Sequence, residues 1–180
     1  MSWSSPLPET QRLFFALWPE VGVREQAARL ARRMLGKQGK RVRPENLHLT
    51  LVFLGSMTEQ QRACAEAVAD TIDGPAFTLR LEQIGHWPRP RVVWLAPQET
   101  PKPLLELAQQ LNQGLAACGY QPEARPYRAH MTLARKVAGY FPAREVAPLV
   151  CPVEYFYLMQ SVTYPRGVEY QVLRTWPLAP

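Results

Sequence analysis

Residues 47–54, LHLTLVFL, form an apolar run that is interrupted by one histidine and one threonine. Residues 129–134, AHMTLA, repeat the same arrangement of histidine, apolar residue, threonine and leucine. Apolar runs of this length predict β-strands. Because alternate side chains of a strand point to the same face, each histidine shares a face with its own threonine. The two runs therefore predict a pair of strands that carry His48, Thr50, His130 and Thr132 into one cleft.

The repetition is what makes this pattern informative. The chain contains only three histidines, and two of them have a threonine two positions further on. A single strand histidine beside a β-favouring threonine would be an ordinary structural feature. A matched pair adds the evidence of internal repetition, so we interpret the two motifs as parts of a functional site.

Composition limits the class of protein. The chain has 180 residues, of which 47% are hydrophobic and 20% charged, as expected for one globular domain. It has no apolar run of the roughly 18–20 residues that would span a membrane. We expect residues 1–11 to be a flexible lead-in rather than a signal peptide, and residues 12–180 to be a single bilobal domain. A net charge of +6 favours a polyanionic partner, nucleic acid first, although a solvated basic surface would give the same charge.

The cysteines indicate a reducing environment. Cys64, Cys118 and Cys151 are odd in number and lie far apart, without CxxC spacing. This pattern argues against a disulfide framework and against a thiolate zinc site. We therefore expect Cys64 and Cys118 to be thiols at or near the core, in helical segments of a cytoplasmic protein.

The order of elements predicts the fold class. Hydrophobic periodicity, glycines and prolines predict strands at 12–18, 47–54, 77–84, 91–95, 127–134, 156–164 and 170–176, and helices at 19–35, 58–72 and 100–119. We interpret this order as a bilobal α+β fold, with two mainly antiparallel sheets facing each other and helices on the outer faces. A ligand would bind in the groove between them.

Two imidazoles and two hydroxyls suit a phosphodiester. Opening a cyclic phosphodiester takes a proton from the attacking oxygen and gives one to the leaving oxygen, and imidazole can do either near neutral pH. Threonine hydroxyls would stabilise the charge that develops on the phosphoryl oxygens. This chemistry requires no metal or other cofactor. A metal site built from His48, His86 and His130 is disfavoured, because no acidic residue forms a local motif with His130 and isolated histidines are non-specific as ligands. His86 has no threonine partner, and we expect it in a loop. The sequence also lacks a GxxxxGK[ST] phosphate loop and a GxSxG nucleophile elbow.

Longer stretches connect the chain to a known family: RLFFAL at 12–17, VRPENLHLTLVFLG at 42–55, PRVVWL at 90–95 and RPYRAHMTLAR at 125–135. On these residues the chain resembles the bacterial 2′-5′ RNA ligase / RNA 2′,3′-cyclic phosphodiesterase family of the two-histidine phosphoesterase superfamily. The resemblance implies hydrolysis of a terminal 2′,3′-cyclic phosphate on RNA to a 2′-phosphate and a free 3′-hydroxyl.

The resemblance also implies catalytic roles. His48 would protonate the departing 3′-oxygen, and His130 would accept the proton of the attacking water. Thr50 and Thr132 would hold the phosphate. If an RNA 5′-hydroxyl replaced the water, the same site would make a 2′-5′ phosphodiester without ATP, and we expect hydrolysis to dominate.

Three further residues are implied to bind substrate. Arg135 matches an arginine that the family places near the phosphate. Phe53 and Tyr127 match groove aromatics that would stack on the terminal base, with core packing as the alternative.

The implied partner is RNA with a 2′,3′-cyclic phosphate end, for which tRNA fragments are one candidate source, and the protein is expected to act as a monomer away from membranes. Two other functions remain open on the sequence. One is a phosphodiesterase for a small cyclic nucleotide or an ADP-ribose cyclic phosphate, and the other is a non-catalytic RNA-binding module.

Overall fold

The computed structural model describes residues 9–180. Its strands are β1 (Thr10–Leu17), β2 (Lys40–Arg41), β3 (Leu49–Thr58), β4 (Phe77–Trp87), β5 (Val92–Ala96), β6 (Met131–Arg135), β7 (Arg144–Val153), β8 (Tyr155–Tyr164) and β9 (Gly167–Pro177). The helices are α1 (Val21–Leu35), α2 (Glu59–Asp70) and α3 (Lys102–Gly114), with short 3-10 turns η1 (Pro44–Asn46) and η2 (Leu115–Cys118).

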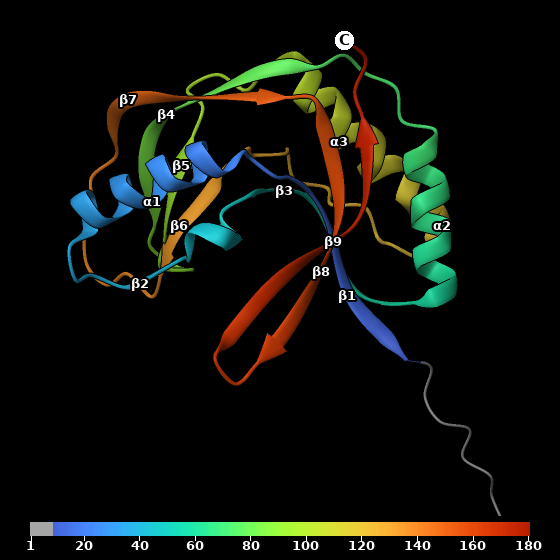
Figure 1. Cartoon of the computed structure of the whole chain (residues 1–180), viewed down its shortest axis with the longest axis horizontal. Helices are drawn as coiled ribbons and strands as arrows, with labels where there is room; N and C mark the ends of the chain where they lie inside the picture. Colours follow the sequence, from blue (N-terminus) through green and yellow to red (C-terminus); the bar gives the residue numbers. More distant parts are fainter. Residues whose placement is uncertain (1–8) are drawn as a thin grey trace, which may run out of the picture.

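The strands form one antiparallel sheet with two halves (Figure 1). The order is β7-β4-β5-β6-β3-β1-β8-β9, with β2 added beside β6. At the centre, β3 and β6 are joined through one residue pair, Leu49 and Met131. The α+β class and the antiparallel pairing are thus confirmed, and the two expected sheets are continuous at this single point.

The helices cover the sheet halves in a crossed manner. Helix α1 follows β1 in sequence but packs against β6 and β7 of the other half. Helices α2 and α3 both pack against β3, although α3 follows β5. Each helix buries an apolar stripe, as Val23, Ala27, Leu30 and Leu35 show for α1. The helices thus bury one face of the sheet and leave the motif face open to the groove.

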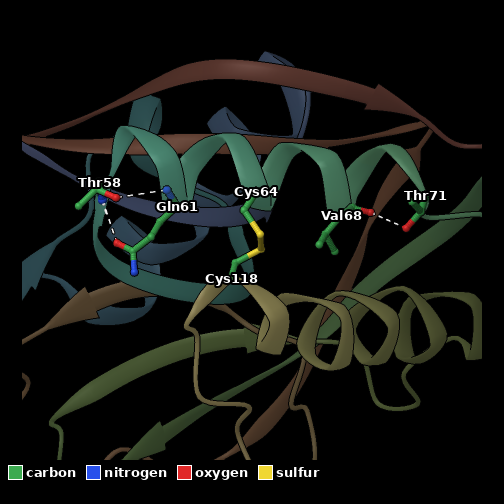
Figure 2. The surroundings of a disulfide bond; sticks show 6 residues. All are labelled: Thr58, Gln61, Cys64, Val68, Thr71 and Cys118. Carbon is green, nitrogen blue, oxygen red and sulfur yellow. Dashed lines mark hydrogen bonds between the residues drawn. A yellow bond between two sulfur atoms is a disulfide. The ribbon is translucent and has the colours of Figure 1, made fainter.

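Helix α2 begins where the sequence predicts. The Thr58 hydroxyl accepts a hydrogen bond from the backbone N–H of Gln61 at 3.2 Å, and the Gln61 side chain accepts one from the backbone N–H of Thr58 at 3.0 Å (Figure 2). This reciprocal capping box satisfies two backbone donors that would otherwise have no partner.

The cysteine prediction is wrong. Cys64 of α2 and Cys118 of η2 form a disulfide that joins two segments 54 residues apart in sequence (Figure 2). Their Cα atoms are 5.6 Å apart because α2 and η2 pack side by side, a relationship that spacing along the chain does not reveal. The odd cysteine, Cys151, is a buried free thiol.

Two other expectations differ from the structure. Strand β7 was not predicted because Pro148 and Pro152 interrupt its sequence, and the fold tolerates them because β7 pairs only with β4 at the edge of the sheet. His86 lies within β4, opposite Val93 of β5, rather than in a loop. None of the described helices is long and apolar enough to cross a membrane.

Candidate active site

The first-motif histidine is held at both ring nitrogens. His48 lies between η1 and β3, and its Nδ1 is 2.6 Å from the backbone oxygen of Asn46. Because a carbonyl only accepts, Nδ1 carries the hydrogen and Nε2 is the nitrogen that exchanges a proton. Nε2 is 3.1 Å from the Thr50 hydroxyl, which confirms that the histidine and threonine of this motif share one face.

Aromatic rings enclose His48. The ring of Trp18 stacks on the imidazole at a centroid distance of 5.8 Å, and Phe14 and Tyr170 lie at 5.1 and 4.9 Å. This burial lowers the pKa of His48 to about 4, against the raising effect of the hydrogen bond to Asn46, and the positive charges of Arg135 and His130 lower it further. Burial therefore favours a neutral His48 at pH 7.

The second-motif histidine has a similar backbone anchor. His130 Nδ1 donates to the backbone oxygen of Arg128 at 2.8 Å, and the ring meets Trp87 of β4 edge-on at a centroid distance of 4.6 Å. Burial lowers the pKa of His130, and the charge of Arg135 acts in the same direction. Again Nε2 is the nitrogen left to take up a proton.

The strand pairing brings the two motifs face to face. Leu49 pairs with Met131 in an antiparallel register. His48 and Thr50 flank Leu49 in sequence, and His130 and Thr132 flank Met131, so this one pair brings both motifs to the same place. The four side chains of the two motifs thus lie around one point where the strands meet, and all four line the same cavity.

Both motifs open into one cavity of about 590 Å³. Its walls come from η1, β2, the ends of β4 and β5, β6, and the tip of the β8–β9 hairpin, which extends beyond the sheet in Figure 1. Six cationic residues line it, and none of the described lining residues is acidic: Lys40, Arg41, Arg43, Arg135, Lys136 and Arg166. The cavity is built to receive an anion.

This arrangement can perform acid–base chemistry on a phosphate. Two imidazoles with exchangeable Nε2 atoms lie in one cationic cavity with two hydroxyls and the guanidinium of Arg135. An anion placed about 4 Å from an imidazolium stabilises the charged ring by about 4 kcal/mol at an effective dielectric constant near 20. Since one pKa unit corresponds to about 1.4 kcal/mol, that interaction suffices to bring a pKa of about 4 to near 7.

Comparison with known proteins identifies the family. The family model described as the 2′-5′ RNA ligase superfamily matches residues 18–161, which include both motifs. The chain belongs to this superfamily. The RNA 2′,3′-cyclic phosphodiesterase of Escherichia coli strain K12 is 38% identical over 130 residues, which cover 72% of this chain and 74% of that protein. The enzyme of the same name from Archaeoglobus fulgidus is 32% identical and covers 92% of this chain and 99% of its own length.

Solved structures of the superfamily share the fold. A crystal structure of Escherichia coli LigT complexed with 3′-AMP matches with a TM-score of 0.91 and 33% identity, over 96% of this chain and 100% of that chain. The similarity thus extends over the whole bilobal sheet and its helices, well beyond the two motifs.

The implied aromatics take different positions. Phe53 is 47% exposed and lies outside the cavity lining, under the guanidinium of Arg12 at 4.8 Å from the ring centroid. A register shift between Phe15 and Ala16 gives the pairs Phe14–Phe53 and Ala16–Thr50. Since cross-strand partners share a face, this shift sets Phe53 on the same face as Thr50, further along β3.

Tyr127 packs in the core and does not face the cavity. Burial raises the pKa of Tyr127, and its hydroxyl donates to the backbone oxygen of Thr50 at 2.9 Å. Tyr127 thus fixes the strand that carries Thr50.

His86 does not join the other two histidines. Its neighbour Trp87 lines the cavity, so the alternation of β4 directs His86 to the opposite face, where its partner Val93 is fully buried. Within residues 9–180, no three His, Cys, Asp or Glu side chains come together in a group that could hold a metal ion.

Sequence reasoning missed the residues that surround the histidines. The aromatic neighbours Phe14, Trp18, Trp87 and Tyr170 were not predicted, because they come from three separate segments of the chain. Asn46 lies two residues before His48 in sequence, but only the structure shows that its carbonyl orients the His48 ring.

Proposed function

We propose that this protein is an RNA 2′,3′-cyclic phosphodiesterase that uses His48 as the proton donor and His130 as the proton acceptor. The observation that carries the proposal is the pairing of Leu49 with Met131, which sets both histidine–threonine motifs against each other in one cationic cavity. The names of the Escherichia coli and Archaeoglobus relatives support the same reaction.

The chemical step needs two proton transfers. Water attacks phosphorus as His130 Nε2 takes its proton, and the bond between phosphorus and the 3′-oxygen breaks as His48 Nε2 supplies a proton to that oxygen. The product keeps the phosphate on the 2′-oxygen. Thr50, Thr132 and Arg135 stabilise the charge on the non-bridging oxygens during the rearrangement.

The proton that the reaction needs can arrive with the substrate. In the empty cavity burial favours the neutral form of both rings. A bound phosphodiester anion raises both pKa values, so a substrate-loaded site holds a proton that the empty site does not. The aromatic neighbours of His48 strengthen this effect, because they exclude the water that would screen the anion.

The cationic lining supports RNA as the substrate class. Besides Arg135, five further cationic residues line the cavity and can contact the phosphates of a longer chain. We propose Phe53 as a stacking platform for a base that lies along β3, and Tyr127 as a residue that positions Thr50. A single chain supplies every one of these groups, which supports action as a monomer, and we propose tRNA fragments as one class of substrate. The cysteine pattern favoured the cytoplasm as its location, and the Cys64–Cys118 disulfide removes that support.

Ligation is the second reaction that we propose for the site. An RNA 5′-hydroxyl in place of water would yield a 2′-5′ linkage, and the strained ring would supply the driving force without ATP. Water is far more concentrated, so ligation would need the second RNA end to be held in place. Hydrolysis should dominate.

Product analysis tests the proposal. The protein is incubated with an oligoribonucleotide that ends in a 2′,3′-cyclic phosphate, with and without EDTA, and the product end is identified. A 2′-phosphate formed at the same rate in both samples supports it. A 3′-phosphate, no turnover, or loss of turnover in EDTA would contradict it, and an equal kcat/KM on a cyclic mononucleotide or a cyclic ADP-ribose phosphate would favour a small-molecule substrate instead.

A further inference from the structure

Among the polar and charged residues of 9–180, Asn46 has the smallest exposed fraction, 9% of its surface. Burying an amide without hydrogen bonds costs about 1–3 kcal/mol, so a buried Asn needs partners. Its side-chain Nδ2 donates to the backbone oxygen of Val168 at 2.8 Å, and its own backbone oxygen accepts the Nδ1 hydrogen of His48 at 2.6 Å. One residue therefore contacts both the catalytic histidine and the β8–β9 hairpin.

The turn that contains Asn46 has two further anchors. Arg43 donates from Nη2 to the same Val168 oxygen at 2.8 Å, and Arg24 of α1 donates from Nη1 to the backbone oxygen of Pro44 at 3.3 Å. Unlike Asn46, both arginine contacts are exposed to solvent, so water can replace them. The Asn46 contact is the one that water cannot easily replace.

We infer that Asn46 is a positioning residue, whose side chain fixes η1 to the hairpin so that its carbonyl holds His48 with the hydrogen on Nδ1 and with Nε2 beside Thr50. The inference rests on the proposed role of His48 as proton donor. It gives a functional role to the hydrogen bond between Asn46 and Val168, although neither residue takes part in the chemical step.

The same contact couples the hairpin to the histidine. Arg166, Gly167 and Tyr170 of the hairpin tip line the cavity, and Tyr170 also meets the His48 ring edge-on. A displacement of the tip would move the Val168 oxygen and, through Asn46, the carbonyl that orients His48. Substrate contacts at the tip and the geometry of the proton donor are thus connected through one side chain.

Loss of the Asn46 side chain should affect the chemical step more than binding. The partners that orient metal-binding histidines typically contribute about 10–100-fold to activity, and we take the same scale for a contact that positions the Asn46 carbonyl. We expect Asn46→Ala to lower kcat within that range while KM changes less than about threefold. Asn46→Asp keeps the side-chain volume and removes the donor, so it tests the same contact if the alanine variant does not fold.

Asn112→Ala is the matched control. Asn112 also bridges two backbone segments, through hydrogen bonds with the backbone oxygen and N–H of Glu123 at 3.1 and 2.9 Å, but it does not line the cavity. Its loss should reduce stability without changing kcat.

The decisive measurement is the tautomer of His48. Nitrogen NMR of the labelled full-length protein at pH 7 should show a single Nδ1–H tautomer in the wild type and in Asn112→Ala, and averaged Nδ1 and Nε2 signals in the Asn46 variants. An unchanged tautomer in the Asn46 variants would overturn the inference. This measurement does not depend on turnover, so it tests the role of Asn46 even if the proposed catalytic function is wrong.

A double-mutant cycle separates positioning from general destabilisation. If Asn46 acts through His48, Asn46→Ala should lower the residual turnover of His48→Ala by less than about twofold. An equal loss in both backgrounds would show that Asn46 does not act through the histidine. Full activity of His48→Ala itself would instead contradict the proposed function.

Discussion

Leu49 of β3 pairs with Met131 of β6, and this pair is the whole of the ladder between the two strands. It brings the histidine and threonine of both motifs to the lining of one cavity. The two imidazoles lie in different surroundings, with His48 among Phe14, Trp18 and Tyr170 and His130 beside Trp87. Acid–base catalysis with two imidazoles requires one ring to hold a proton while the other is free. Burial lowers the pKa of both rings, so burial alone does not assign the donor.

Removal of either imidazole should abolish most turnover. We expect His48→Ala and His130→Ala each to lower kcat for cyclic phosphate opening by about 10²–10⁴-fold, and the double variant to fall little further because the pair acts as a unit. Steady-state kinetics on an oligoribonucleotide measures this. His86→Gln, on the opposite face of β4, should stay within about twofold of the wild type. Unchanged turnover in either alanine variant would favour a non-catalytic RNA-binding role.

The pH–rate profiles should differ between free and substrate-bound protein. Burial lowers the pKa of both histidines in the empty cavity, so the bell-shaped profile of kcat/KM should have its maximum below pH 6.5. The bound phosphate anion raises both pKa values, so the maximum of kcat should lie at higher pH. Arg135→Gln removes a positive charge and should move the kcat/KM maximum upward. Coincident maxima in the wild type would count against this account.

Burial of His48 should make stability depend on pH. The pKa of its ring is about 4 in the folded protein against 6.5 as the ordinary value, so the stability is fully present above pH 6.5 and is lost as the pH falls toward 4. Between pH 7.5 and 4.5 this group should cost about 2–3 kcal/mol. Urea unfolding of His48→Asn should show a correspondingly smaller loss over the same range, and an equal loss in both proteins would refute the assignment.

The cationic residues that line the cavity should increase the affinity for RNA. We expect Arg166→Ala and Lys136→Ala to raise KM for an oligoribonucleotide with little change in kcat, and each to reduce the slope of log(kcat/KM) against log salt by about one if it contacts a phosphate. Arg29→Ala removes the same charge from an exposed position on α1, outside the cavity, and is the control. Equal effects of all three substitutions would indicate net charge alone.

The disulfide between Cys64 and Cys118 should support stability and not catalysis. A bond that closes a loop of 54 residues contributes up to about 4 kcal/mol to the free energy of unfolding in chain-entropy estimates. The double variant Cys64→Ser/Cys118→Ser should lose about 2–4 kcal/mol in urea unfolding and keep its kcat, because neither residue lines the cavity. Wild type in a strong reductant should match it. A loss of kcat in the variant would contradict this separation.

Sequence patterns predicted the elements whose information is local. The alternation at 47–54 placed His48 and Thr50 on one face, and the hydrogen bond between them confirms it. The start of the second helix at residue 58 was also predicted, and the structure shows a capping box there, formed by Thr58 and Gln61.

Tertiary relationships could not be predicted in this way. The sequence does not show that Cys64 meets Cys118, that Leu49 pairs with Met131, or that Tyr127 bonds to the Thr50 carbonyl. Each of these depends on how helices and strands pack, which no spacing along the chain reports. Sequence-based assignment also passed over β7, whose two prolines are typical of loops away from a sheet edge.

The crossed placement of the helices has a consequence for how the molecule holds together. Helix α1 follows a strand of one half and covers the other, and α3 does the reverse. A fragment that contained only one half of the sheet would therefore lack a helix that covers that half. The walls are interlocked, so their spacing, and with it the width available to a phosphate, is a property of the entire polypeptide.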